Sequence, residues 1–190
     1  MVSDYFVYLT MSDSKLDLSA INKTLGEAFF IQQKFEIPRY QRPYAWKGEQ
    51  IEDFWTDLTT DEDTYFVGNI ICNTSRLDKD DVIEIIDGQQ RIITVTIFSA
   101  ALIDILETID SKKAETFYHY DIYPEDQNGD RFWRITAGLS TQKYFKKYIQ
   151  KREHDILSSI PKTPEEKLIK GNYKLIYDKL NAYIKNTQKE

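Results

Sequence analysis

The sequence has few residues of several types, and each scarcity excludes a class of protein. A single cysteine, Cys72, in 190 residues excludes an internal disulfide framework and a cysteine-rich zinc site, and it is typical of the cytoplasm. Seven glycines and five prolines predict short loops. The first residues contain no basic segment followed by an apolar one, so no secretory signal is predicted. Polar residues interrupt the longest apolar stretch, which therefore does not predict a membrane span.

Basic residues are scarce in the first part of the chain. Residues 1–110 contain 20 acidic and 9 basic side chains, whereas residues 111–190 contain 11 and 16. This acidic part does not bind duplex DNA through charge alone. It has four arginines, and three of them, Arg39, Arg42 and Arg91, lie in two unusual polar segments.

The hydrophobic patterns predict an α+β fold, with a small mixed sheet and helices over residues 1–110 and a helical extension packed on it over residues 111–190. Residues 1–15 are expected to be a loosely held start. Strands are expected over 35–37, 65–72 and 82–86. Helices are expected over about 20–28, where Ser19 could cap the first turn, over 48–59 and over 90–108. A further helix, which carries Ile169, Tyr173, Ile176, Leu180 and Tyr183, is expected to begin with a capping box at Thr163, Pro164 and Glu166.

The first unusual segment is IIDGQQR, residues 85–91, between two apolar runs. Asp-Gly between β-prone residues is typical of a hairpin. The same residues also fit a strand, a tight turn at Gly88 and a helix. In that case the first free N–H groups of the helix and the guanidinium of Arg91 would form a phosphate site. The residues alone leave both interpretations open.

The second segment is IPRYQRPYAW, residues 37–46. Its two prolines are unfavourable in a central strand. Arg39 and Arg42 are candidates for phosphate contact, and Tyr40, Tyr44 and Trp46 for stacking on a base. Alternatively, the segment is a surface loop whose aromatic residues anchor it and whose arginines pair with nearby acids.

Together these segments resemble a known family. IPxYQRxYxW, an amphipathic helix, YFxGxI, and IDGQQR before a long apolar helix are similar to the N-terminal domain of GmrSD-type restriction systems. This resemblance implies a fold like that of ParB and sulfiredoxin. It also implies a cytoplasmic anti-phage protein that binds and hydrolyses a nucleoside triphosphate. Hydrolysis would be coupled to recognition or cleavage of foreign, often modified, DNA.

The resemblance also implies roles for individual residues. Asp87, Gly88, Gln89, Gln90 and Arg91 would form the phosphate and catalytic site, facing Tyr40, Gln41 and Arg42. Apart from the resemblance, the acidic surroundings predict that Mg²⁺ accompanies the nucleotide and is held by Asp87, whose alternative role is a turn or helix cap. Gln89 or Gln90 is expected to position the attacking water. The remaining nucleotide-binding residues would be Arg39, Tyr40, Gln41, Arg42, Tyr44, Trp46 and Thr94. Ile93 stands where the family commonly has threonine, so hydrolysis is expected to be weaker or absent if that hydroxyl contributes.

Two alternatives remain. In the first, the domain senses DNA without binding nucleotide: residues 39–46 read a modified backbone or base, while the phosphates contact Lys143, Lys146, Lys147, Lys151 and Arg152. In the second, the two segments only stabilise the core of a partner-binding domain. The resemblance also implies a nuclease module of the His-Asn-His type in the full system. His119 and His154 do not form a metal-ligand pattern, so that nuclease is expected in a partner domain or subunit.

Overall fold

The computed structural model describes residues 5–12, 15–24, 34–59, 66–74, 82–138 and 142–187. Its strands form one mixed sheet in the order β2-β1-β4-β5-β3-β6. The strands are β1 (Tyr5–Ser12), β2 (Lys15–Thr24), β3 (Lys34–Ile37), β4 (Phe66–Asn73), β5 (Val82–Asp87) and β6 (Ile135–Ala137).

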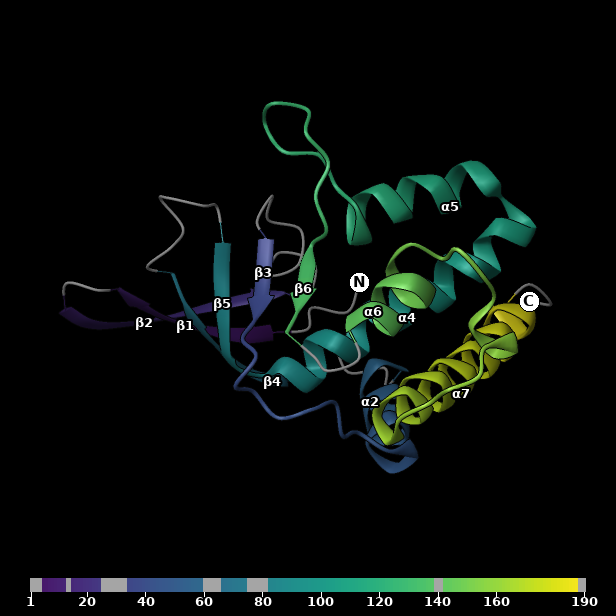
Figure 1. The fold of residues 1–190 in the computed structure, drawn as a ribbon, viewed down its shortest axis with the longest axis horizontal. Coiled ribbons are helices and arrows are strands. Elements are labelled where there is room, and N and C mark those ends of the chain that lie inside the picture. Colours follow the sequence, from purple (N-terminus) through teal and green to yellow (C-terminus); the bar gives the residue numbers. More distant parts are fainter. Residues whose placement is uncertain are drawn as a thin grey trace.

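The helices lie to one side of this sheet (Figure 1). They are α2 (Gly48–Thr59), α4 (Gln89–Ile109), α5 (Ser111–Phe117), α6 (Gln142–Phe145) and α7 (Pro164–Thr187), with short π-helical turns η1 (Tyr118–Ile122) and η2 (Lys146–Gln150) and a 3₁₀ turn η3 (Ile156–Ser158). The predicted α+β class is therefore confirmed.

Parallel pairing of β3 and β5 places the two unusual segments together. Phe35 is paired with Ile83 and Glu36 with Glu84, so both strands end at the same edge of the sheet. The segment after β3 is IPRYQRPYAW, and the residues after β5 are GQQR. Because carboxyl ends of neighbouring parallel strands meet, two segments about 45 residues apart in sequence become neighbours.

Helix α4 lies at the centre of the helical layer. It is buried nearly all round, from Gln89 to Ile105, and packs against α7 and α5. By length and composition α4 could cross a membrane, but most of it is buried, as expected for the core helix of a folded domain. Buried residues from Phe35 to Leu180 form one continuous core, so residues 111–187 pack on the sheet-bearing part without a break.

The sequence predicts the bounds of β3, α2, β5 and α4 to within about two residues, and it predicts where α7 begins. The capping box of α7 is also confirmed: the N–H of Glu166 donates to Thr163 Oγ1 at 3.1 Å, and the N–H of Thr163 to Glu166 Oε2 at 3.3 Å.

Two predictions near the N-terminus were wrong. Residues 20–24 belong to β2 rather than to a helix, and residues 5–12 form β1 rather than a loose start. Long-range pairing explains both, because β1 pairs with β2 and also with β4. Sheet pairing outweighs the local helix signal at Ser19. The rest of the predicted helix lies outside the described residues.

Gly88 forms the turn between β5 and α4. Its φ of 92° is in the left-handed region, and a Cβ there would lie 3.0 Å from Ile70 Cγ1 and 3.1 Å from Asn69 O. Both the backbone conformation and the close approach of β4 therefore require glycine. This turn, together with the apolar surface of α4, produces strand–turn–helix rather than the alternative hairpin.

We expect Gly88→Ala to lower the free energy of unfolding by about 2–4 kcal/mol, because it adds a steric clash to the cost of a left-handed alanine. Gly129→Ala is the matched control: Gly129 has φ 83° but nothing within 4 Å of an added Cβ. It should cost about 1 kcal/mol. Urea denaturation of both variants measures the difference, and equal losses would contradict a steric role for β4.

Asp121, in η1, is a half-buried acid that lies far in sequence from the sheet edge at which β3 and β5 end. Its Oδ1 has no hydrogen-bond partner in the described part of the chain. Burial raises the pKa of Asp121 from 3.8 to about 6, although a hydrogen bond with Ser99 and the charge of Arg134 act in the opposite direction. The folded state therefore binds this proton more tightly than the unfolded state does.

The protein should therefore lose stability as pH rises from about 4 to about 6, because the unfolded chain releases the Asp121 proton first. The loss is at most about 3 kcal/mol. Asp121→Asn mimics the protonated form, so its advantage over the wild type should grow across this interval. Thermal unfolding of both proteins at several pH values tests this, and parallel pH profiles would contradict it.

Candidate functional site

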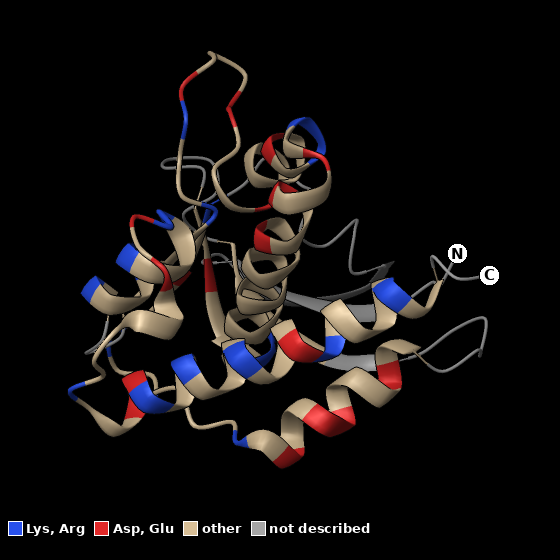
Figure 2. Ribbon diagram, turned by 90° about the vertical axis from the view of Figure 1, so that its right-hand side faces the viewer, with Lys and Arg blue, Asp and Glu red and all other residues tan. Residues whose placement is uncertain are grey.

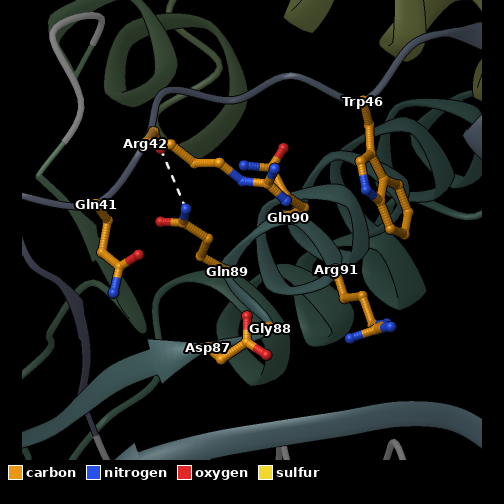
Figure 3. Close-up of a pocket in the computed structure, with 8 residues that line it drawn as sticks. All are labelled: Gln41, Arg42, Trp46, Asp87, Gly88, Gln89, Gln90 and Arg91. Carbon is orange, nitrogen blue, oxygen red and sulfur yellow. Dashed lines mark hydrogen bonds between the residues drawn. The ribbon is translucent and has the colours of Figure 1, made fainter.

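A cavity of about 420 Å³ opens where the two segments meet at the edge of the sheet. Residues of both segments line it (Figure 3): Gln41, Arg42, Trp46, Asp87, Gly88, Gln89, Gln90 and Arg91. The structure thus brings together eight of the residues predicted for the site. The other four predicted nucleotide-binding residues do not line it: Arg39, Tyr40, Tyr44 and Thr94.

The N-terminus of α4 points its unpaired donors at this cavity. Gly88 precedes the helix and offers no side-chain cap. The N–H groups of Arg91 and Ile92 both donate to Gly88 O, at 3.1 and 3.2 Å. The N–H groups of Gln89 and Gln90 have no partner in the described residues. Two free donors and the positive end of the helix dipole therefore favour an anion.

Gln90 binds the backbone of the facing segment with its whole amide group. Its Oε1 accepts a hydrogen bond from Ala45 N at 2.8 Å, and its Nε2 donates to Pro43 O at 3.1 Å. The predicted role of Gln90 in positioning water is therefore not supported, because both polar atoms are already bonded. Gln90 instead fixes the segment that carries Arg42.

Gln89 binds the facing segment with only one of its two polar side-chain atoms. Its Nε2 donates to Arg42 O at 3.2 Å, as the dashed line in Figure 3 shows. Its Oε1 is buried and has no partner in the described residues. A buried acceptor without a partner is costly, so Gln89 Oε1 is the glutamine atom that remains for a ligand or a water molecule.

The charged side chains of the cavity differ in how they are bound. Arg91 is half-buried and donates to Asn69 O at 3.2 Å. Arg42 is exposed and has no carboxylate partner among the described residues. Asp87 is exposed at the end of β5. Pairing of Arg42 with nearby acids, the alternative interpretation of this segment, is therefore not observed in the described part of the chain.

Tyr44 and Thr94 lie in the core, which corrects their prediction as nucleotide-binding residues. Tyr44 is 1% exposed, and its hydroxyl is 2.8 Å from Thr94 Oγ1. Burial raises the pKa of Tyr44 to about 12, so the phenol stays neutral. A ring enclosed by the core cannot stack on a base. Ile93 is also fully buried and does not line the cavity, so the missing hydroxyl there removes no ligand contact from this cavity.

The other residues of the segment vary in position. Gln41 lines the cavity but donates its Nε2 to Ile86 O at 2.8 Å. Trp46 is half-buried, tilted against Phe54 at a centroid distance of 6.0 Å. Tyr40 is 73% exposed, and its hydroxyl is 3.4 Å from Glu84. Among the described residues that line the cavity, Trp46 is therefore the one aromatic residue.

The predicted DNA contacts of the helical part are mostly engaged with other residues. Arg152 binds Asp104 and Glu107, which corrects its prediction as a phosphate contact. Lys151 pairs with Glu153 at 2.9 Å. The ammonium groups of Lys146 and Lys147 lie 5.3 and 5.1 Å from the rings of Trp133 and Tyr148, and Lys143 is exposed.

The basic residues of α7 lie next to the acidic residues of the neighbouring helix α2. Figure 2 shows lysines along α7 beside the acidic residues of α2, where Lys179 and Glu52 form an ion pair at 2.5 Å. A continuous basic surface is therefore not formed by these two helices.

No group of three acidic, histidine or cysteine side chains in the described residues could bind a metal. Asp87 is the one carboxylate that lines the cavity. His119 contacts Arg131 and Glu115 instead.

Two residues of α7 that contact this site are absent from the sequence-based prediction. Glu165 Oε1 accepts a hydrogen bond from Tyr44 N at 2.8 Å, and Asn172 Nδ2 donates to Trp46 O at 2.8 Å. The sequence contained a signal, because Asn172 interrupts the apolar stripe of Ile169, Tyr173 and Ile176. A polar residue at a buried helical position needs a partner.

Comparison with known proteins identifies a family whose matched region contains both segments. No curated protein matches the chain. The family described as "GmrSD restriction endonuclease, N-terminal domain" matches residues 25–189, which include both segments and α7. The chain therefore belongs to the GmrSD N-terminal domain family, and its role lies in the defence function of a restriction system.

Proposed function

We propose that the cavity binds the phosphates of a nucleoside triphosphate. The convergence of several groups on one cavity carries this proposal: two free N–H groups of α4, the guanidinium groups of Arg42 and Arg91, and the unpaired Oε1 of Gln89. The N–H groups and the two guanidinium groups attract a polyanion. The ParB and sulfiredoxin likeness is part of the same proposal, supported by the strand–turn–helix arrangement around Gly88.

The number of these groups is sufficient for useful affinity. Micromolar binding needs about 8 kcal/mol. Charge-assisted hydrogen bonds contribute about 1.5–3 kcal/mol each, before the cost of ordering the ligand is subtracted. Two arginines and two helix donors reach that gross value. Trp46 adds a partly exposed ring on which a base of any type can stack.

Hydrolysis of the triphosphate is the second part of the proposal. A water molecule would attack the γ-phosphorus, breaking its bond to the β–γ bridging oxygen and releasing inorganic phosphate. Gln89 Oε1 is the group that orients this water, since Gln90 is fully bonded. Asp87 would bind Mg²⁺ together with the phosphates, because one carboxylate suits an ion that keeps most of its other ligands from water and phosphate.

In a restriction system, this site would couple nucleotide turnover to recognition of foreign DNA by a nuclease partner. The alternative is a DNA-sensing domain that binds no nucleotide. The intramolecular pairing of Arg152 and Lys151 favours the nucleotide over DNA as the ligand of this chain.

Arg42→Ala should weaken or abolish nucleotide binding without unfolding the protein, because Arg42 is exposed and its side chain has no partner in the described residues. Arg39→Ala is the matched control, since Arg39 is exposed in the same segment but does not line the cavity. Losing one charge-assisted contact predicts an affinity at least about tenfold lower.

Calorimetric titration with ATP, GTP, CTP and UTP in the presence of Mg²⁺ measures this difference. Equal affinities of the two variants would contradict the site. If no triphosphate binds the wild type, the DNA-sensing alternative is favoured, and modified DNA becomes the next titrant.

A further inference from the structure

The segment from Arg42 to Trp46 has no backbone hydrogen bond to another backbone group in the described residues. Pro43 lacks an N–H, and the extended path leaves the other groups without a ladder partner. Four side chains bind five of its backbone groups instead. Gln89 and Gln90 of α4 bind Arg42 O, Pro43 O and Ala45 N.

The remaining two groups are bound by α7. Glu165 accepts from Tyr44 N and Asn172 donates to Trp46 O, across 121 and 126 residues of sequence. Glu165 is 6% exposed and Asn172 is 3% exposed. The segment therefore lies between two helices: side chains of α4 bind three of its backbone groups, and side chains of α7 bind the other two.

Asn172 also belongs to a hydrogen-bond chain in the core. Its Nδ2 donates to the Tyr44 hydroxyl oxygen at 2.9 Å as well as to Trp46 O. The Tyr44 hydroxyl also shares a hydrogen bond with Thr94 Oγ1, 2.8 Å away, in which either oxygen can be the donor. One amide group thus determines the positions of both the Tyr44 ring and the Trp46 backbone, and through Thr94 it connects α7 with α4.

We propose that Asn172 and Glu165 are positioning residues of the nucleotide site. Neither lines the cavity, so neither contacts the ligand. They determine where the backbone between Tyr44 and Trp46 lies, and thereby the direction of the Trp46 ring and the distance of Arg42 from the α4 N-terminus. This inference rests on the proposed function.

The first test replaces the amide by an apolar group of similar size. Asn172→Leu retains packing in the apolar stripe of α7 but leaves Trp46 O and the Tyr44 hydroxyl without their donor. We expect about tenfold weaker binding of whichever of ATP, GTP, CTP and UTP binds the wild type, which corresponds to about 1.4 kcal/mol. Asn181→Leu is the matched control, the same change at a half-buried position of α7 whose side chain makes no hydrogen bond to the described residues.

A second readout does not depend on the nucleotide. In a Trp55→Phe, Trp133→Phe background, Trp46 is the only tryptophan, so acrylamide quenching of its fluorescence reports its position directly. Asn172→Leu should increase quenching, while Asn181→Leu should not. Circular dichroism of each variant establishes that it remains folded.

Glu165 provides an independent test if Asn172→Leu does not fold. Glu165→Gln keeps an acceptor for Tyr44 N and should bind nucleotide like the wild type, whereas Glu165→Leu removes it and should bind about tenfold less well. Wild-type affinity and quenching in a folded Asn172→Leu or Glu165→Leu protein would overturn the inference. A wild type that binds no triphosphate would overturn the proposed function instead, and Trp46 quenching would still decide whether α7 positions the segment.

Discussion

The backbone of residues 42–46 has no backbone hydrogen-bond partner within the described residues, so side chains bind it instead. Two prolines in IPRYQRPYAW prevent regular structure, yet the segment lies against the core. Side-chain amides are suited to this task because one group both donates and accepts. This requirement explains why two glutamines lie between two buried segments, and why α7 buries a glutamate and an asparagine.

The arginines show how an acidic domain can still attract an anion. Arg152 is neutralised by two carboxylates and connects the 151–155 turn to α4. Arg42 has no carboxylate partner in the described residues, although acidic side chains outnumber basic ones in its part of the chain. An exposed guanidinium beside two free helix N–H groups gives the cavity a local positive potential, which the net charge of −6 does not reveal.

Local signals predicted much of this structure, and long-range contacts account for most of what they missed. The long apolar run of α4 and the capping box of α7 are signals within one stretch of sequence, and both were confirmed. The role of Tyr44 depends on Thr94 and Asn172, 50 and 128 residues away. No local pattern distinguishes an aromatic ring that stacks on a ligand from one that the core encloses. The unpaired Oε1 of Gln89 was likewise visible only once the partners of both glutamines were known.

The cavity depends on α7, so the predicted division of the chain into residues 1–110 and 111–190 does not separate two independent units. Helix α4 ends there and α5 begins, but the hydrophobic core continues on both sides, and residues from both sides contact the site. Without α7, Tyr44 N and Trp46 O would lose their partners, and the face of α4 that packs on α7 would be exposed to water. The glutamines of α4 alone would then fix only part of the segment that carries Arg42. The smallest unit that can present this cavity therefore includes α7, which agrees with a family match that continues to residue 189.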